Sequence, residues 1–271
     1  MTEKNLPEPP EHLSSEEFRE HGHALIDWIA DYWDRVENLP VMSQVTPGTI
    51  RDHLPSHAPE TGEPFENLIR DLDSVVMPGI THWQHPSWFA FFPANASPPS
   101  VLAELASAGL GVQGMLWSTS PAATEIESHV LDWLVDLLDL PTSWKTTEQG
   151  GGVLQMSASD STHTALVVAR HQAAKSGISP DSMVAYASTQ THSSIQKGAT
   201  VAGYGHVRLI DVDDEQAMRS EDLRVAIERD RADGLSPIFV AATIGTTGTT
   251  GVDPIRSIGE ICRDEDLWLH I

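Results

Sequence analysis

The sequence is poor in cysteine and contains no long apolar segment. Its single cysteine, Cys262, excludes a disulfide within the chain and any cluster of thiolate metal ligands. Because Cys262 lies at helical spacing from Ile258 and Ile261, we expect it to pack in a core. No apolar segment approaches the roughly 20 residues of a membrane-spanning helix, and the acidic, proline-rich N-terminus is unlike a signal peptide. These absences predict a cytoplasmic, globular protein.

Basic residues are scarce relative to acidic ones. The chain has 39 Asp and Glu residues against 16 Lys and Arg, which gives a formal charge of −23. Nucleic acids and anionic membranes bind basic surfaces, so we expect neither as a partner. The acidic residues are spread along the chain, which favours solubility over a specific acidic site. With 40% hydrophobic residues in 271, the chain is long enough for a substantial core.

The first part of the chain is predicted to be helical with irregular loops. Ser14 and Glu17 form a capping-box pattern before an amphipathic helix. Its apolar face consists of Phe18, Leu25, Trp28, Ile29, Tyr32, Trp33 and Val36. The proline-rich residues 40–64 separate this helix from the rest of the chain, so the face packs either on a second subunit or on its own domain.

Two further helices are expected before residue 150. One covers residues 65–77 and is ended by Pro78 and Gly79, and the other covers residues 121–140 with Ser120 as its N-cap. The second helix is expected to turn one apolar side inward: Ile126, Val130, Trp133, Leu137 and Leu138.

From residue 150 the pattern alternates between strands and helices. The predicted strands cover residues 153–156, 183–187, 207–210, 238–244 and 267–271. Helices are predicted to begin near Asp160, Ser193, Glu221 and Pro254. This alternation is typical of an α/β fold with an open parallel sheet and right-handed crossovers. Ligands bind such sheets beyond the carboxyl ends of the strands, so the residues after each strand are the candidates for chemistry.

The first predicted strand lies between a Gly150–Gly152 run and the residues "SASDS", Ser157 to Ser161. Small residues, free first-turn amides and hydroxyls at a helix N-terminus suit a phosphate group. The alternative is a plain helix cap formed by Ser159. Since the P-loop and dinucleotide glycine patterns are both missing, a small phosphate-bearing ligand fits better than a nucleotide.

Two further loops follow strands at the same edge. His192 comes after the second strand, where it either stacks on a planar ligand, donates a proton, or caps the next helix. The loop "GTTGTTG", Gly245 to Gly251, follows the fourth strand and either holds polar ligand atoms or turns the chain.

An aromatic segment interrupted by Pro86 and Pro93 lies upstream of the sheet. Its rings are Trp83, Trp88, Phe89, Phe91 and Phe92. Prolines disfavour a central strand, so the segment is irregular and either walls a pocket for an apolar side chain or packs in a core. His82 and His85 lie nearby, but without a third ligand at suitable spacing we do not expect a metal site.

Together, these segments resemble the group II pyridoxal-phosphate amino-acid decarboxylases, in the aromatic-L-amino-acid and tyrosine decarboxylase branch. The resemblance rests on "HPSWFAFFPANAS", "WSTSPAATEIESHVLDWLVDLLDLP", "GGGVLQMSASDST", "VAYASTQTHSSIQKGA" and "ATIGTTGTTGVDPI" with "ICRDEDLWLHI". It implies a type I, PLP-dependent transferase-like large domain with a mainly parallel sheet and flanking helices. It also implies that residues 1–80 form a helical dimerisation segment, that residues 81–271 form an incomplete cofactor-binding domain, and that the enzyme is a homodimer.

The resemblance assigns roles to residues already singled out. It implies that Ser157, Ala158 and Ser159 bind the phosphate of pyridoxal 5'-phosphate, that His192 covers the pyridine ring and acts in catalysis, and that Thr247 lines the cofactor site. The residues it implies for the substrate are Trp83, Phe91, Phe92, Pro93 and Ala94, with Gln113 and Met115 reaching in from the neighbouring subunit.

The implied reaction is decarboxylation of an L-amino acid to the amine and CO2. This branch often has Tyr and Thr where Phe91 and Ala94 stand, and two apolar residues where Gln113 and Met115 stand. The substrate therefore stays open, with an aromatic amino acid expected. A same-fold enzyme that forms an aldehyde or transaminates, and a non-catalytic fragment or half of a split enzyme, are the alternatives.

Two groups that the family needs are missing from the chain. The family pattern "WLHVDAA" has a pyridine-pairing Asp two residues after the position of His270, and its Schiff-base lysine lies further on. None of the four lysines, Lys4, Lys145, Lys175 and Lys197, follows a predicted strand. We therefore expect the 271 residues alone to be inactive, and to bind the cofactor weakly without a stable imine.

Overall fold

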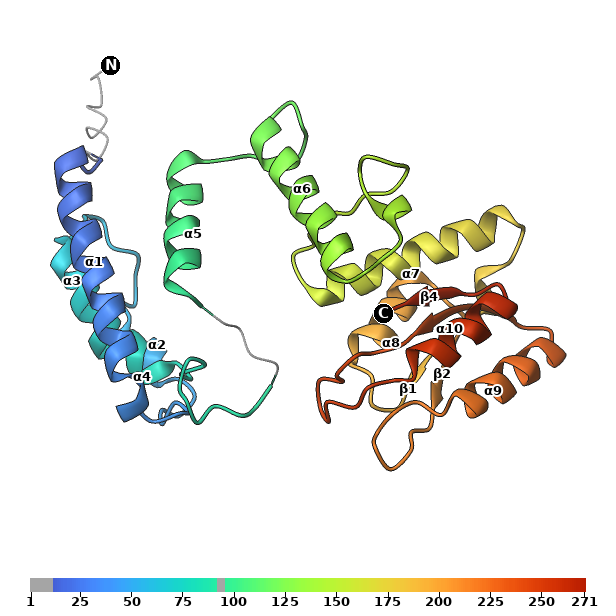
Figure 1. Ribbon diagram of the computed structural model, residues 1–271. Coiled ribbons are helices and arrows are strands. Elements are labelled where there is room, and N and C mark those ends of the chain that lie inside the picture. The colour runs from blue at the N-terminus through green and yellow to red at the C-terminus, as the bar shows by residue number, and fades with distance from the viewer. Residues whose placement is uncertain (1–11, 92–95) are drawn as a thin grey trace, which may run out of the picture. The chain divides into compact units, whose positions relative to one another are not determined.

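The computed structural model describes residues 12–91 and 96–271. The chain divides into two compact units, Met1–Leu105 and Ala106–Ile271. Their helices and strands are labelled in Figure 1. Among the described residues, no helix is both long enough and apolar enough to cross a membrane.

The N-terminal unit consists of helices and loops. Its helices are α1 (Ser15–Arg35), α2 (Thr49–His53), α3 (Phe65–Asp71) and α4 (Met77–Gly79), with a 3-10 turn at Val36–Asn38 and a π-helical segment at Leu72–Val76. The predicted capping box is confirmed: the Ser14 side chain accepts from the Glu17 amide, and the Glu17 carboxylate accepts from the Ser14 amide. The helix predicted from Phe65 also forms and continues to Gly79.

The apolar face of α1 contacts its own unit. The indole N–H of Trp28 donates a hydrogen bond to the Asp73 carboxylate at 3.2 Å, and the Tyr32 hydroxyl lies 3.1 Å from Nδ1 of His82. The sequence left open whether this face packs on a second subunit or on its own domain. Trp28 and Tyr32 contact their own domain. Phe18 at the start of the same face is 60% exposed.

Most of the secondary structure beyond residue 105 belongs to an α/β domain. Helix α5 (Pro98–Leu110), which the sequence pattern did not predict, precedes α6 (Pro121–Leu137). The remaining helices are α7 (Ala158–Lys175), α8 (Ser194–Ala202), α9 (Ser220–Ala232) and α10 (Ile255–Asp264), with 3-10 turns at Thr142–Trp144 and Pro180–Ser182. The strands are β1 (Met183–Ser188), β2 (His206–Ile210), β3 (Ser236–Ala241) and β4 (Trp268–His270).

All strand pairs are parallel, and the strand order is β2-β1-β3-β4. The chain leaves β1 towards β2 and then returns past β1 to β3 and β4. The direction of winding therefore reverses between β1 and β3, which makes the carboxyl edge of these two strands the switch point where open α/β sheets bind ligands.

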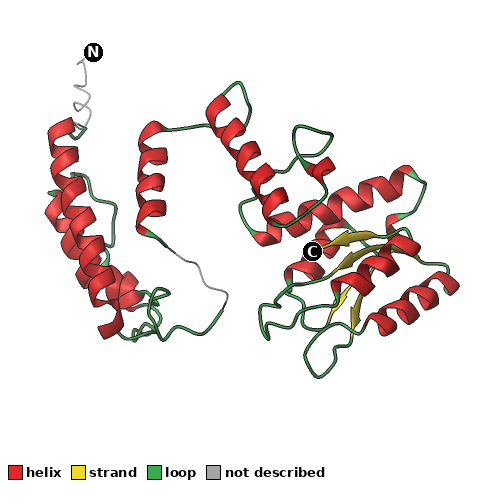
Figure 2. Cartoon of the chain, in the orientation of Figure 1, coloured by secondary structure: helices red, strands yellow, loops and turns green. Residues whose placement is uncertain are grey.

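Helices cover both faces of this sheet, as Figure 2 shows. On one face α7 and α8 bury a cluster that includes Leu166, Ile195, Ala199 and Phe239. On the other face α9 and α10 bury a second cluster that includes Tyr186, Leu223, Ile227 and Ile258. Both faces of β1 are inaccessible along its whole length, which explains its continuous apolar sequence.

Two predictions about this unit are wrong. Residues 153–156 form no strand, and Val153 and Leu154 are each 62% exposed. A short apolar run can form either a buried strand or a loop, because a strand also needs a neighbouring strand to pair with. Here the Leu154 amide donates a hydrogen bond to the Glu127 carboxylate at 2.8 Å, in place of a bond to a neighbouring strand. On α6, the side expected to face inward is largely open, with Trp133 60% exposed.

Candidate functional site

The N-terminus of α7 has the geometry expected of an anion-binding turn. Ser157 is the N-cap, and its Oγ accepts a hydrogen bond from the Asp160 amide at 3.2 Å. The same hydroxyl donates to the Asp160 carboxylate at 2.9 Å. Helix geometry leaves the amides of Ala158 and Ser159 without intrahelical acceptors, so they are directed beyond the helix end. The cap is Ser157 rather than Ser159, which leaves the Ser159 hydroxyl out of this capping interaction.

His192 lies in the loop between β1 and α8. Its Nδ1 accepts a hydrogen bond from the Ser194 amide at 3.3 Å and lies 2.9 Å from the Ser194 hydroxyl. Since a backbone amide only donates, Nδ1 carries a lone pair and the ring proton is on Nε2. His192 thus caps the start of α8, as one alternative predicted, while its other ring nitrogen remains available as a donor.

The structure brings the α7 turn and His192 into one pocket. The pocket has a volume of about 230 Å³. It is lined by Ser159, Asp160, His163, His192, Ser193, Ser194, Lys197, Gly198 and Val201. Ser159 and His192 are 33 positions apart in the sequence, so their meeting is a result of the fold and not of local geometry.

The two neighbouring threonines after β3 have different environments. Thr246 is 1% exposed, and its hydroxyl accepts from the Gly251 amide at 2.9 Å and lies 2.8 Å from the Thr249 hydroxyl. Thr247, the residue predicted to line the cofactor site, is exposed. Thr246 therefore closes the loop, and Thr247 is the threonine that faces outward.

Sequence reasoning missed Asp253, which braces the same loop. Its carboxylate is 2% exposed and accepts from the amides of Met218 and Thr243, each at 2.8 Å. These bonds fix the chain just after β3. The available signal was an acidic residue directly before a helix, in "GVDPI", which is common enough in surface turns to be uninformative.

His270 ends β4 at the edge where the candidate residues lie. Its ring stacks on Phe239 with centroids 5.7 Å apart, and its Nε2 lies 3.4 Å from the Thr162 hydroxyl of α7. Burial lowers the pKa of His270 below its ordinary range. The ring is therefore neutral near pH 7 and joins the first part of α7 to the sheet.

Two of the residues predicted for the substrate lie in an aromatic cluster of the N-terminal unit. The Trp83 ring lies 5.1 Å from that of Trp88 and 6.0 Å from that of Phe91, with which it is stacked. Phe91 has a positive φ of 58° and is 76% exposed, so it is not a core residue of this unit. The cluster thus presents an open aromatic surface.

The other predicted substrate residues are distributed differently. Phe92, Pro93 and Ala94 lie outside the described residues. Gln113 and Met115 belong to the unit formed by residues 106–271, where the Gln113 carbonyl accepts from Thr119 at 2.7 Å and Met115 is 73% exposed.

The three described lysines have distinct positions. Lys145 forms an ion pair with Asp136 at 2.5 Å, and Lys175 is the last residue of α7. Lys197 lies within α8 and lines the pocket with Ser159 and His192. As predicted, none of these three follows a strand.

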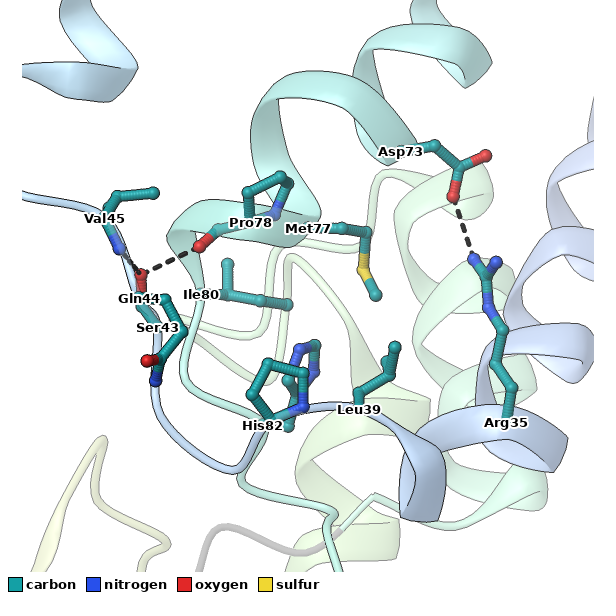
Figure 3. A pocket seen from close by; sticks show the side chains of 11 residues that line it. Arg35, Leu39, Ser43, Gln44, Val45, Asp73, Met77, Pro78, Ile80 and His82 are labelled. Atoms are coloured by element: carbon teal, nitrogen blue, oxygen red, sulfur yellow. Dashed lines mark hydrogen bonds and ion pairs between the residues drawn. The ribbon is translucent and has the colours of Figure 1, made fainter.

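A separate pocket of about 480 Å³ lies in the N-terminal unit. Figure 3 shows Leu39, Met77 and Ile80 lining it beside the Arg35–Asp73 ion pair, whose N–O distance is 2.8 Å. Burial lowers the pKa of His82 in this pocket, and the nearby His85 lowers it further. Among the described residues, no group of three His, Cys, Asp or Glu side chains is arranged to hold a metal ion.

Comparisons with known proteins agree with this geometry. Residues 47–271 match the pyridoxal-dependent decarboxylase conserved domain. The chain is 42% identical to phenylacetaldehyde synthase of Arabidopsis thaliana, and the match covers 96% of this chain and 54% of that protein. It is 41% identical to aromatic-L-amino-acid decarboxylase of Rattus norvegicus, and this match covers 96% of this chain and 56% of that protein. It superposes on Catharanthus roseus tryptophan decarboxylase, solved in complex with L-tryptophan, with a TM-score of 0.91 and 39% identity over 96% of this chain and 57% of that one.

The chain thus spans about half the length of the curated relatives it matches. The matched domain covers most of its residues, including the α7 turn, His192 and the whole sheet. The chain belongs to the pyridoxal-dependent decarboxylase family.

Proposed function

We propose that this chain forms the cofactor-binding part of a pyridoxal-phosphate enzyme that decarboxylates an aromatic L-amino acid to its amine. The observation that carries the proposal is the shared pocket of Ser159 and His192 between the starts of α7 and α8. Tryptophan and aromatic-L-amino-acid decarboxylases among its relatives support the reaction and the substrate class.

The donors present fit a phosphorylated pyridine aldehyde. A phosphate dianion needs several donors and a positive field, and the α7 turn offers the Ser159 hydroxyl, first-turn amides and the positive end of an 18-residue helix. The planar pyridine ring can stack on another planar group, and the imidazole of His192 is such a group. Asp160 is the one lining residue whose charge opposes the phosphate.

When bound, pyridoxal phosphate supplies the conjugated ring that accepts the electron pair released when the substrate loses CO2. Under this proposal, Ser157, Ala158 and Ser159 hold the phosphate, and Thr247 contributes a hydroxyl to the site. His192 lies over the ring and, with its proton on Nε2, serves as the proton donor. The protein's task is to hold the substrate's carboxylate at the correct angle and to deliver a proton.

We assign the substrate's aromatic side chain to Trp83 and Phe91, with Phe92, Pro93, Ala94, Gln113 and Met115 as further substrate residues. The exposed rings of Trp83 and Phe91 support this assignment, because open aromatic surface suits an apolar ligand. Aldehyde formation is the second candidate reaction, because phenylacetaldehyde synthase is 42% identical to this chain. Product analysis with L-phenylalanine, L-tyrosine and L-tryptophan, on an enzyme that also carries the pyridine-pairing Asp and the Schiff-base lysine, distinguishes an amine from an aldehyde.

We further propose that the active form is a cytoplasmic homodimer. Its support is the apolar surface that residues 106–156 leave open. The large side chains concerned are Leu110, Val112, Met115, Leu116, Trp117, Ile126, Trp133, Leu137, Leu138, Trp144, Val153, Leu154 and Met156. Exposed apolar side chains gathered in one segment suit an obligate interface. Sedimentation of the wild type and of Trp133→Glu tests this, since the substitution should shift a dimer towards monomer.

Binding of pyridoxal 5'-phosphate tests the site directly. We expect saturable quenching of tryptophan fluorescence by the cofactor, weakened on the order of tenfold by His192→Ala and by Ser159→Ala, since each removes contacts worth about 1–2 kcal/mol. Ser220→Ala, which alters a partly exposed serine at the start of α9, is the matched control and should bind normally. Equal affinity in all variants would contradict the proposed site.

A further inference from the structure

Lys197 lies in the candidate cofactor pocket although the sequence places it inside a helix and not after a strand. Its amide donates to the Ser193 carbonyl at 3.1 Å, so it belongs to the first turn of α8. Its side chain lines the pocket together with Ser159 of the α7 turn and His192. The pocket therefore contains one lysine side chain.

Close packing of two helices brings Lys197 to this position. The neighbouring residue, Gly198, is buried, and a Cβ atom there would lie 2.9 Å from Cδ1 of Leu166 and 3.8 Å from the His163 Cα of α7. Leu166 is itself fully buried. Because glycine lets α8 lie directly against α7, the start of α8 is held beside the turn that begins α7.

The charge of Lys197 is not used elsewhere among the described residues. Lys145 pairs with Asp136, whereas Lys197 forms no ion pair within the described part of the chain. In a chain of charge −23 a phosphate dianion meets general repulsion, and Asp160 adds to it inside the pocket. An ammonium group at this position offsets both effects, because lysine binds phosphate as a compact point charge.

We propose that Lys197 is an additional phosphate-binding residue of the cofactor site. Its ammonium group holds the phosphate of pyridoxal 5'-phosphate from the α8 side, opposite the hydroxyls and amides of the α7 turn. This inference rests on the proposed function and extends it by one residue. It also gives Lys197 an electrostatic role, distinct from that of a lysine that reacts with the cofactor's aldehyde.

The test compares ligands with and without a phosphate. Dissociation constants for pyridoxal 5'-phosphate and for pyridoxal are measured by fluorescence titration on the 271-residue chain and on Lys197→Gln, Lys197→Arg and Lys175→Gln. The Lys175→Gln variant is the matched control, because it removes the same charge from the other end of α7.

We expect Lys197→Gln to bind pyridoxal 5'-phosphate on the order of 3- to 10-fold more weakly, the loss expected for one solvent-accessible charged contact. Pyridoxal binding should not change, and added salt should reduce the difference between Lys197→Gln and the wild type. Lys197→Arg should retain most of the affinity. Circular dichroism of each variant confirms that it is folded.

Each failure has a distinct meaning. If the wild type shows no saturable binding of pyridoxal 5'-phosphate, the proposed function and this inference both fail. If the wild type binds and Lys197→Gln behaves like Lys175→Gln, only the role of Lys197 is overturned. An equal loss for pyridoxal, or a borohydride-fixed adduct found on Lys197 by peptide mass spectrometry, also overturns it, because the residue then acts on the fold or on the aldehyde.

Discussion

Tyr186 of β1 donates a hydrogen bond from its hydroxyl to the carboxylate of Asp230 on α9 at 2.8 Å. Tyr186 is fully buried and Asp230 is 3% exposed. Arg208 of β2 donates to the same carboxylate from Nε at 3.1 Å and from Nη2 at 2.9 Å. One buried carboxylate thus joins two strands and a helix on the face of the sheet away from α7 and α8.

Removing this carboxylate should destabilise the C-terminal unit more than removing the phenol. Breaking a buried pair costs about 3–5 kcal/mol, and the 38% exposure of the Arg208 side chain reduces our expectation for Asp230→Ala to about 2–3 kcal/mol. Tyr186→Phe keeps the ion pair and should cost about 1 kcal/mol. Urea unfolding followed by circular dichroism measures both. Glu228→Ala, an exposed acid on α9, is the control, and an equal loss there would refute the role of Asp230.

The free energy of unfolding should decrease as the pH falls below about 6.5, partly because of His270. Burial lowers its pKa in the folded state, so the unfolded chain takes up the proton first and is favoured as the pH falls. The stability that the neutral ring provides is present above its ordinary pKa and is lost as the pH drops towards the folded-state value. His270→Gln should flatten this part of the profile, measured by urea unfolding between about pH 7.5 and about pH 5.5. His171→Gln, at an exposed position of α7, should decline like the wild type, and an unchanged slope in His270→Gln would exclude the effect.

Local sequence chemistry was enough to predict a helix that begins near residue 160, four of the strands of the parallel sheet, and the place of His192 in the loop after a strand. A serine cap, alternating apolar segments and a polar residue after a strand are all readable within a few positions. The resemblance to decarboxylases added the cofactor, which polar residues alone left as an unnamed phosphate-bearing ligand.

What the sequence could not provide depends on contacts between distant segments. Residues 153–156 have the apolar character of a strand, but strand formation requires a partner, and here the backbone bonds to Glu127 instead. Lys197 lines the pocket next to Gly198, where the absence of a side chain lets α8 lie against Leu166 of α7. The choice between Thr246 and Thr247 depends on a bond to Gly251, which no local pattern encodes.

Substitution of the two threonines after β3 should separate stability from cofactor binding. Thr246→Val removes the acceptor of the buried Gly251 amide and should cost about 1–3 kcal/mol in urea unfolding. Thr247→Val changes an exposed side chain, so its effect on stability should stay within about 0.5 kcal/mol. If Thr247 lines the cofactor site, its variant instead weakens binding of pyridoxal 5'-phosphate in fluorescence titrations. The reverse pattern, with Thr247→Val the less stable protein, would contradict these assignments.

Adding one methyl group at Gly198 should push α8 away from α7 and disturb the pocket. Alanine is favoured over glycine within a helix by about 1 kcal/mol. Against this, the new Cβ would lie 2.9 Å from Leu166, and overpacking of a buried site costs about 1–3 kcal/mol. Since Leu166 is fully buried and has little room to move, we expect Gly198→Ala to be destabilised by up to about 2 kcal/mol and to bind pyridoxal 5'-phosphate more weakly. Gly22→Ala in α1, whose Cβ would meet nothing within 4 Å, is the matched control and should be stabilised in the same urea titration. Equal stabilisation of the two variants would show that the contact between α7 and α8 is not tight enough to position Lys197.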